Sequence, residues 1–444
     1  MIFKNHRELI DNGKTETIRQ KRSDILTILD EMSAFLNPYQ LVSSHIYENR
    51  LILSTQSIDP ADYHHLFLIG FGKASVRMAQ AVCDIIKVHE GAVITNDTTA
   101  TVSSPNIKTY YGGHPLPNQG SIQATEQLIK LTKKCSSNDL LVVLISGGGS
   151  ALLCHPKITL EDLQTTTSLL LRAGASITEL NTIRKHLSNV KGGQLISSIP
   201  CQVISLVLSD VINDPLSFIA SGPTFPDETT FHDAHAILSS YALWHQIPSS
   251  VQTIIRNGEQ GLIMETPTMN ASFFDHVTHE IIGNNTLACQ QAAQSAQRLG
   301  YHPEIISTSI TGQAREQGPR FIYTACPRTT DKTSLFIGGG ETTVTVQGSG
   351  KGGRNQEMVL GSLKTIEQTD MVFACLATDG YDGTSPVAGA IADGYSLQRA
   401  RHLQLDPTGF LNQNDSYHFF ESMHDHLHTG PTGSNVMDVF ILIP

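Results

Sequence analysis

The sequence lacks the features that mark secreted and membrane-spanning proteins. Its seven cysteines are widely spaced, their number is odd and no C-x-x-C motif occurs, which argues against a disulfide framework and a zinc site. No apolar run approaches the roughly 20 residues that span a bilayer. The N-terminal segment has no apolar stretch long enough for a signal peptide. We therefore expect reduced thiols and a cytoplasmic location.

Positive charge is also scarce. The chain carries 30 lysine and arginine residues against 41 aspartate and glutamate residues, a formal net charge of −11. This balance argues against nucleic acids and membrane surfaces as partners, because nothing neutralises their phosphates in bulk. The 40% hydrophobic and 16% charged content fits a soluble globular protein. We expect small-molecule substrates and a homodimer as the assembly.

The hydrophobic pattern predicts an α/β fold in two domains, because 444 residues exceed one ordinary core. Continuous apolar runs at 66–70, 91–95, 140–146 and 202–209 alternate with helix-like spacers, as in a doubly wound parallel sheet covered on both faces. After about residue 270, alternation such as "TVTV" predicts a mixed sheet. We place a doubly wound α/β domain at 1–250 and a C-terminal α/β domain at 251–444. The polar, helical segment 239–260 is expected to bridge them.

Four predicted strands run directly into glycine-rich turns. The clearest is "LVVLISGGGSALL" at 141–153, and the others are "LIGFGKAS", "GGGETT" and "TDGYDGT". Parallel strands deliver such turns to the carboxyl edge of a sheet, where ligands bind. Glycine lets the backbone approach an anion, and a following helix would add its dipole. The sequence therefore predicts a site for a highly anionic ligand, collected from several strands.

The turn "GFGKAS" has two interpretations. It resembles the dinucleotide fingerprint G-x-G-x-x-G, with Ser75 in place of the third glycine and Asp97 placed to bind a ribose. Lys73 favours a phosphate or carboxylate ligand instead, because a cation inside the loop suits an anion. The sequence does not match the P-loop pattern G-x-x-x-x-G-K-[ST].

Charged residues accompany these turns. Asp210 ends a strand, where a carboxylate could hold Mg²⁺ or accept a proton from a hydroxyl. Arg354 is the best candidate for a two-pronged contact with a carboxylate or phosphate. The stretch 180–195 could border a cleft with Arg184 and Ser188, or with Lys185 and His186. These features together suit phosphoryl transfer from a nucleotide, where positioning and charge neutralisation supply most of the catalysis.

Eight motifs, spread in order over nearly the whole chain, resemble those of the class II glycerate kinases. They are "GFGKAS", "GGHPLPNQGS", "LISGGGSALL", "LNTIRKHLSNVKGGQL", "LSDVINDPLSFIASGPT", "GGGETTVTVQGSGKGGRNQE", "ATDGYDGTSPVAGA" and "TGPTGSNVMDV". The resemblance implies a Rossmann-like domain followed by a MOFRL-type domain, with the active site in the cleft between them. It also implies phosphorylation of D-glycerate at the 2-hydroxyl by ATP with Mg²⁺, giving 2-phosphoglycerate and ADP.

The resemblance assigns roles to individual residues. Lys73, Asp210 and Arg354 would be catalytic, with Asp210 accepting the proton of the attacking hydroxyl. Which of the two cations holds the carboxylate and which the phosphoryl group stays open. Asp210, Asp379 and Asp382 would hold the metal, although Pro386 stands where the family often has a further acid. The substrate- and phosphate-binding positions would be Gly70, Gly72, Ser146, Gly147, Gly148, Gly149, Ser150, Arg184, Lys191, Asn355 and Glu341.

Two alternatives remain at this point. An NAD(P)-dependent hydroxypyruvate reductase would use the loop at 70–75 and a histidine such as His114 or His186 as its acid. A non-catalytic sensor of a sugar acid or phosphate would keep Lys73 and the glycine loops. The presence of Asp210 favours an enzyme over the sensor.

Overall fold

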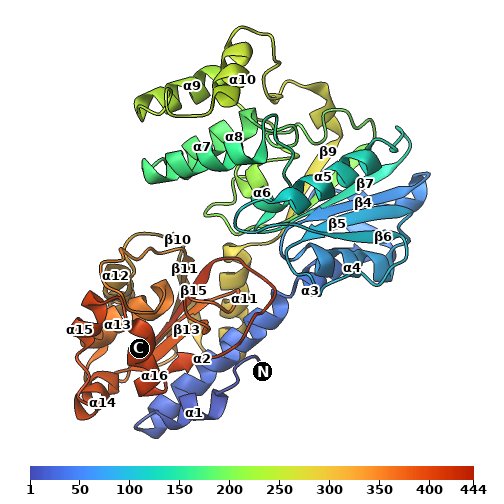
Figure 1. Ribbon diagram of the computed structural model, residues 1–444. Coiled ribbons are helices and arrows are strands. Elements are labelled where there is room, and N and C mark those ends of the chain that lie inside the picture. Colours follow the sequence, from blue (N-terminus) through green and yellow to red (C-terminus); the bar gives the residue numbers. More distant parts are fainter. The chain divides into compact units, whose positions relative to one another are not determined.

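Two six-stranded sheets dominate the computed structural model, which describes residues 1–444 (Figure 1). They belong to different structural units. The first unit comprises residues 38–282, and the second combines residues 1–37 with residues 283–444. No helix is both long enough and apolar enough to cross a membrane.

The first unit is built on the sheet β6-β5-β4-β7-β8-β9, in which the strands from β6 to β8 all pair in parallel. Every residue of β4 and β7 is buried, as expected for strands covered on both faces. Helices α4 and α5 follow β4 and β6 in the chain. The bounds are β4 (Leu66–Phe71), α4 (Ser75–Ile85), β5 (Glu90–Thr95), β6 (Ile107–Tyr111), α5 (Gln119–Thr132), β7 (Leu140–Ile145), β8 (Gln202–Leu208) and β9 (Val277–Gly283).

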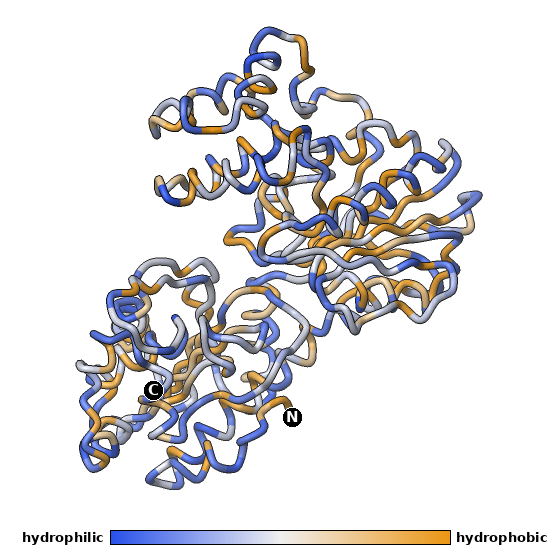
Figure 2. The backbone as a smooth tube through the Cα atoms, in the orientation of Figure 1, coloured by the Kyte–Doolittle hydropathy of each residue, from blue (hydrophilic) through white to orange (hydrophobic).

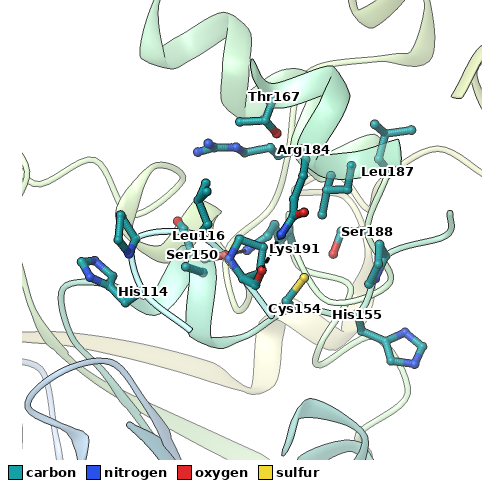
Figure 3. Close-up of a pocket in the computed structure, with 17 residues that line it drawn as sticks. His114, Leu116, Ser150, Cys154, His155, Thr167, Arg184, Leu187, Ser188 and Lys191 are labelled. Carbon is teal, nitrogen blue, oxygen red and sulfur yellow. Dashed lines mark hydrogen bonds between the residues drawn. The ribbon is translucent and has the colours of Figure 1, made fainter. Parts of the chain in front are cut away.

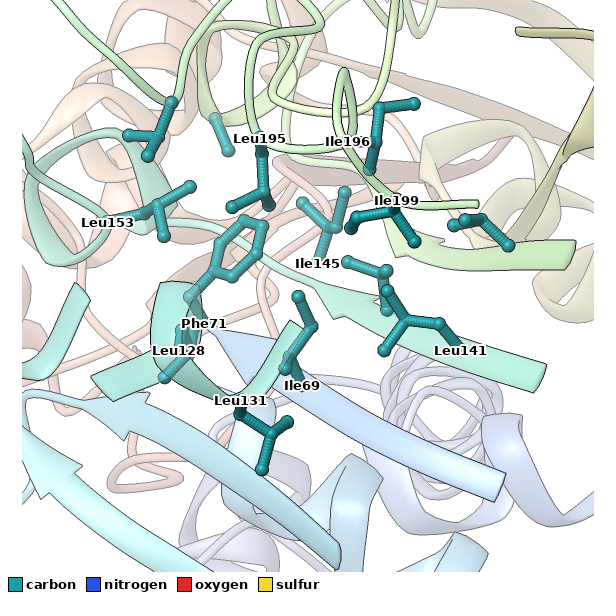
Figure 4. Packing of buried hydrophobic residues seen from close by; sticks show 14 of the residues in the cluster. Ile69, Phe71, Leu128, Leu131, Leu141, Ile145, Leu153, Leu195, Ile196 and Ile199 are labelled. Carbon is teal, nitrogen blue, oxygen red and sulfur yellow. The ribbon is translucent and has the colours of Figure 1, made fainter. Parts of the chain in front are cut away.

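The core of this sheet joins alternate strand residues to the segments that cover them. Figure 4 shows Ile69, Phe71, Leu141 and Ile145 of β4 and β7 packed against side chains from α5 and from the segment after Lys191. Figure 2 shows the hydrophobic residues concentrated along these strands. The packing fixes the strand ends, from which the site residues project.

A separate layer of helices forms a second core in the first unit. Trp244, Val251 and Ile255 pack there with Leu180 and Phe231. The segment 239–260 therefore belongs to this unit, and the prediction that it bridges two domains was wrong. The helices are α6 (Gly149–Leu152), α7 (Leu160–Arg172), α8 (Ile177–His186), α9 (Phe231–Ser240) and α10 (Ser249–Glu259).

The first unit also contains a short helix, α3 (Pro38–Ser43), and a small antiparallel sheet. The strands of that sheet are β1 (Ile46–Tyr47), β2 (Arg50–Ile52) and β3 (Ser57–Ile58).

The second unit contains a mixed sheet in the order β10-β11-β15-β12-β13-β14. Only β10 and β11 pair in parallel, and the other neighbours are antiparallel. The predicted combination of a parallel and a mixed sheet is thus confirmed. The strands are β10 (His302–Ile310), β11 (Ser334–Gly340), β12 (Val372–Ala377), β13 (Gly389–Asp393), β14 (His426–Leu427) and β15 (Asp438–Ile443).

The N-terminal helices belong to this second unit, and a buried arginine shows why. Arg22 of α2 is fully buried and lies 2.6 Å from Asp393 and 2.8 Å from Asp425. The observed units therefore differ from the predicted ranges 1–250 and 251–444, since residues 1–37 belong to the second unit and residues 251–282 to the first. The helices are α1 (His6–Asp11), α2 (Glu16–Phe35), α11 (Asn285–Arg298), α12 (Ala314–Ala325), α13 (Arg354–Ile366), α14 (Ser396–His402), α15 (Pro407–Asn412) and α16 (Ser416–Met423).

Candidate active site

The turns after β4 and β7 interlock at the carboxyl edge of the parallel sheet. The Lys73 N–H donates to the Gly147 carbonyl at 2.9 Å, and the Ala74 N–H donates to the Ser146 hydroxyl at 3.1 Å. Gly72 has a φ of +125°, and a Cβ there would lie 2.2 Å from the Ser146 hydroxyl oxygen. Glycine is required at this position, and the close approach joins Lys73 to the glycine loop.

Asp210 reaches the same loop from the neighbouring strand. It follows β8, which pairs with β7. A Cβ built on Gly147 would lie 2.2 Å from the Asp210 Oδ2 atom, so the carboxylate packs directly against the bare backbone of Gly147. The structure thus brings Lys73, Gly147 and Asp210 together from three adjacent strands, as the sequence predicted.

The loop has free hydrogen-bond donors, although its helix is short. The N–H groups of Gly147 and Gly148 donate to no other backbone group, and α6 has only four residues. The expected contribution from a helix dipole is therefore small, because so short a helix aligns few peptide dipoles. The groups that can attract an anion here are these N–H groups and the exposed Lys73 ammonium, which forms no ion pair within the protein.

His114 also lies at the loop. A Cβ on Gly148 would lie 3.0 Å from the His114 ring and 3.3 Å from the Lys73 side chain. Burial and the nearby Lys73 charge lower the pKa of His114. The imidazole is therefore neutral near pH 7. It can donate one hydrogen bond and accept another without adding positive charge to the loop.

Two side chains that the sequence analysis did not single out, Ser221 and Asn181, support the predicted Ser150 through hydrogen bonds. The Ser150 and Ser221 hydroxyls lie 3.0 Å apart, and the Ser221 hydroxyl donates to Asn181 Oδ1 at 3.0 Å. Ser221 and Ala220 have φ values of 63° and 51°, in the left-handed region. Such non-glycine conformations cost about 1–3 kcal/mol each and cluster at functional sites. The motif "IASGP" carried this signal, but a backbone angle cannot be read from residue types.

A pocket opens beside the loop, and two predicted cations line it (Figure 3). Arg184 of α8 and Lys191 both project into it, next to Ser150 and Leu116. Lys191 is buried and donates to the carbonyls of Ser150 and Leu153 at 2.8 and 3.2 Å. Burial lowers the pKa of Lys191 to about 8. Arg184 forms no hydrogen bond or ion pair within the protein, and burial lowers its pKa as well.

The neighbouring basic residues of α8 have structural partners. Lys185 is buried 3.1 Å from Asp227, and the buried His186 ring lies 3.2 Å from Glu265. Of the two predicted pairings along α8, the structure therefore supports Arg184 with Ser188, which lines the same pocket. Lys185 and His186 do not border it.

In the second unit, Arg354 opens α13 and is held by two carboxylates. Its guanidinium makes a two-pronged contact with the buried Asp438, and Glu341 lies 3.1 Å from its Nη1 atom. Burial raises the pKa of Asp438, while Arg354 opposes that effect. Asp438 was not among the predicted site residues, although the motif "TGPTGSNVMDV" contains it. Its role depends on β15 lying beside β11 and β12, a pairing that the sequence does not reveal.

Asp382 has a structural task at the same helix. Its carboxylate accepts hydrogen bonds from the backbone N–H groups and the side-chain amides of Asn355 and Gln356. Burial raises the pKa of Asp382 to about 6. Asp379 accepts from the Tyr381 N–H in its own turn. No three histidine, cysteine or acidic side chains converge as a metal site. The assignment of Asp382 and Asn355 to metal and substrate remains a prediction.

The features required for a dinucleotide-dependent reductase have other roles. The Asp97 carboxylate accepts from the N–H and hydroxyl of Thr99, which forms a local turn. The Ser75 hydroxyl is buried and donates to the Ile94 carbonyl. His186 is fully buried against Thr182 and Glu265. His114, by contrast, lines the pocket beside the glycine loop.

Comparison with known proteins agrees with the kinase motifs. A domain of unknown function, DUF4147, matches residues 24–256, and the MOFRL family matches residues 334–438. A protein of Pyrococcus horikoshii named glycerate 2-kinase is 36% identical over 94% of this chain and 96% of its own. A Thermotoga maritima protein named D-glycerate 2-kinase is 37% identical over 89% of this chain and 94% of its own.

Solved structures show the same fold. The crystal structure of glycerate kinase from Thermotoga maritima matches with a TM-score of 0.83 and 35% identity. The match covers 94% of this chain and 97% of that one. Similarity at this level, over nearly the full length of both chains, shows common ancestry as well as a common fold. The chain belongs to the glycerate 2-kinase family.

Proposed function

We propose that this protein transfers the γ-phosphoryl group of ATP to the 2-hydroxyl of D-glycerate, which gives 2-phosphoglycerate and ADP. One observation carries the proposal. A carboxylate, Asp210, and a lysine without an ion-pair partner, Lys73, meet at a loop with free N–H donors on Gly147 and Gly148. Phosphoryl transfer needs this combination of a proton acceptor and several positive dipoles or charges. The names of the relatives supply the acceptor.

Each residue then has a defined task. Asp210 accepts a hydrogen bond from the attacking hydroxyl and takes its proton as the new P–O bond forms. The Lys73 ammonium and the N–H groups of Gly147 and Gly148 neutralise the oxygens of the transferred group. Because that transition state is loose, positioning and neutralisation do most of the work.

Mg²⁺ would arrive with the nucleotide. This ion keeps several waters and binds through phosphates with one or two carboxylates, so a cage of three protein side chains is not required. Asp210 is the carboxylate that fits this role, since it lies at the loop. Asp382 fits poorly, since both its oxygens already accept hydrogen bonds from α13. When bound, the ion would neutralise charge on the phosphates.

Arg354 is proposed to hold an anionic group of the substrates, as the resemblance implies. Asp438 fixes its guanidinium, and Glu341 occupies one further nitrogen. The homodimer and the cytoplasmic location remain predictions from the sequence.

The test is a turnover assay with ATP, Mg²⁺ and D-glycerate, in which ADP is measured enzymatically and the product is identified by phosphorus NMR. The proposal predicts ADP release that requires D-glycerate, with 2-phosphoglycerate as the product. Formation of 3-phosphoglycerate would correct the position of transfer. Oxidation of NADH by hydroxypyruvate without any kinase activity would overturn the proposal.

A further inference from the structure

The pocket beside the glycine loop is more apolar than glycerate requires. Pro115, Leu116, Leu163 and Leu187 form part of its wall. All heteroatoms of glycerate are polar oxygens on a three-carbon chain, so an apolar wall would leave them without partners. A flat heteroaromatic ring, in contrast, is stabilised by such a wall.

The pocket also carries positive charge without a matching acid. Arg184 and Lys191 line it, and no aspartate or glutamate does. Neither cation forms an ion pair within the protein, although both are largely removed from water. Two desolvated, uncompensated cations are costly unless a ligand brings negative charge. The occupant therefore combines an apolar ring with an anionic group.

The pocket is continuous with the proposed reaction loop. Gly148 and Ser150 line it, while Gly147 beside them contacts Asp210. His114 lies at the junction, next to Gly148 and the Lys73 side chain. A ligand seated here would direct its far end toward Lys73.

We infer that this pocket holds the nucleotide, with the base against Leu116 and its neighbours and the phosphate chain along Arg184, Lys191 and the glycine loop. The inference rests on the proposed function and assigns one of its two substrates to one pocket. D-Glycerate then binds outside the pocket, on the Asp210 side of the loop. Arg184 and Lys191 are phosphate ligands and not ligands of the glycerate carboxylate.

Calorimetric titration of the full chain tests this assignment without turnover. The probes are ADP and inorganic triphosphate, which share anionic charge but differ in the base. Arg184→Met removes the charge from the pocket, and Leu116→Ser removes part of the apolar wall from a half-exposed position that folding tolerates. Arg172→Met and Leu171→Ser are the matched controls, because both residues are exposed on α7 outside the pocket.

Arg184→Met is expected to lower the affinity for both probes about tenfold or more, because a hydrogen bond to a charged group is lost. Leu116→Ser is expected to lower the affinity for ADP about three- to tenfold. The affinity for triphosphate should stay within about twofold of the wild-type value. The controls should match the wild type, and neither pocket variant should raise the KM for D-glycerate.

Two results would overturn the assignment. If Arg184→Met raises the KM for D-glycerate and leaves the ADP affinity unchanged, the pocket binds the acceptor instead. If both pocket variants leave the KM and both affinities unchanged, the pocket binds neither substrate. Failure of the proposed function would give a different result. A wild type that binds ADP in this pattern but forms no phosphoglycerate would retain the nucleotide pocket and reject glycerate as the acceptor.

Discussion

Replacing Gly147 with alanine tests whether the position of Asp210 governs the reaction. The new methyl carbon would lie 2.2 Å from Asp210 Oδ2. A carbon and an oxygen in contact stay about 3.3 Å apart, so the carboxylate must retreat by roughly 1 Å. The backbone permits alanine here, since Gly147 does not have a positive φ. A 1 Å misplacement of a reacting group can lower the rate about 10²-fold, which corresponds to about 2.7 kcal/mol of activation free energy.

The assay is kcat for ADP formation with D-glycerate, together with the melting temperature of the same variant. Gly147→Ala should lower kcat about 10²-fold while ADP affinity stays near that of the wild type. Gly409→Ala is the control, because Gly409 lies inside α15, where the atoms nearest to a new Cβ belong to the Asp406 side chain. A Gly147→Ala variant with wild-type kcat would refute the reasoning that the Asp210 carboxylate acts from its observed place.

Three further predictions concern buried charges. Arg22→Met should lower the free energy of unfolding by about 3–5 kcal/mol in urea titrations, because it leaves Asp393 and Asp425 buried without their cation; Arg7→Met at an exposed pair should change it by less than about 1 kcal/mol. Asp438→Asn should lower kcat about tenfold or more at saturating substrates, because Arg354 loses its two-pronged contact with the carboxylate. A wild-type kcat in this variant would show that Asp438 does not position Arg354 for the reaction. The affinity for ADP should fall as pH rises from 7 through about 8, because burial lowers the pKa of Lys191 to about 8 and the neutral amine no longer attracts phosphate. Lys191→Met should abolish this fall above pH 7, where the ADP phosphates are already ionised.

The sequence predicted those features that depend on neighbouring residues. Fully buried strands such as β4 and β7 appear in it as unbroken apolar runs, and their parallel pairing placed Lys73, Gly147 and Asp210 at one edge. The glycines were informative because a turn alone rarely needs several of them in a row at the end of a strand. At this edge of the sheet, the apolar strand pattern and the rule that ligands bind at the carboxyl ends of parallel strands led to the same prediction.

Features that depend on distant contacts were missed. Arg22 looks like one charge among several on an amphipathic helix, yet it is fully buried between Asp393 and Asp425. That contact joins residues some 400 positions apart, and no local pattern indicates it. For the same reason the sequence did not indicate that the Asp382 carboxylate accepts hydrogen bonds from the first backbone N–H groups of α13. Residue type suggested the chemistry in each case, but the tertiary partner determined the role.

The most direct test of the central claim compares Asp210→Asn with Asp214→Asn, a neutralised carboxylate four residues along the same loop. Single-turnover formation of 2-phosphoglycerate from D-glycerate and saturating ATP would be followed by quenched flow and NMR. The account predicts that Asp210→Asn binds Mg²⁺-free ADP normally but loses phosphoryl transfer by about 10²-fold or more, while Asp214→Asn retains most of it. Transfer at the wild-type rate by Asp210→Asn would contradict the account, because the reaction would then not depend on the carboxylate at the glycine loop.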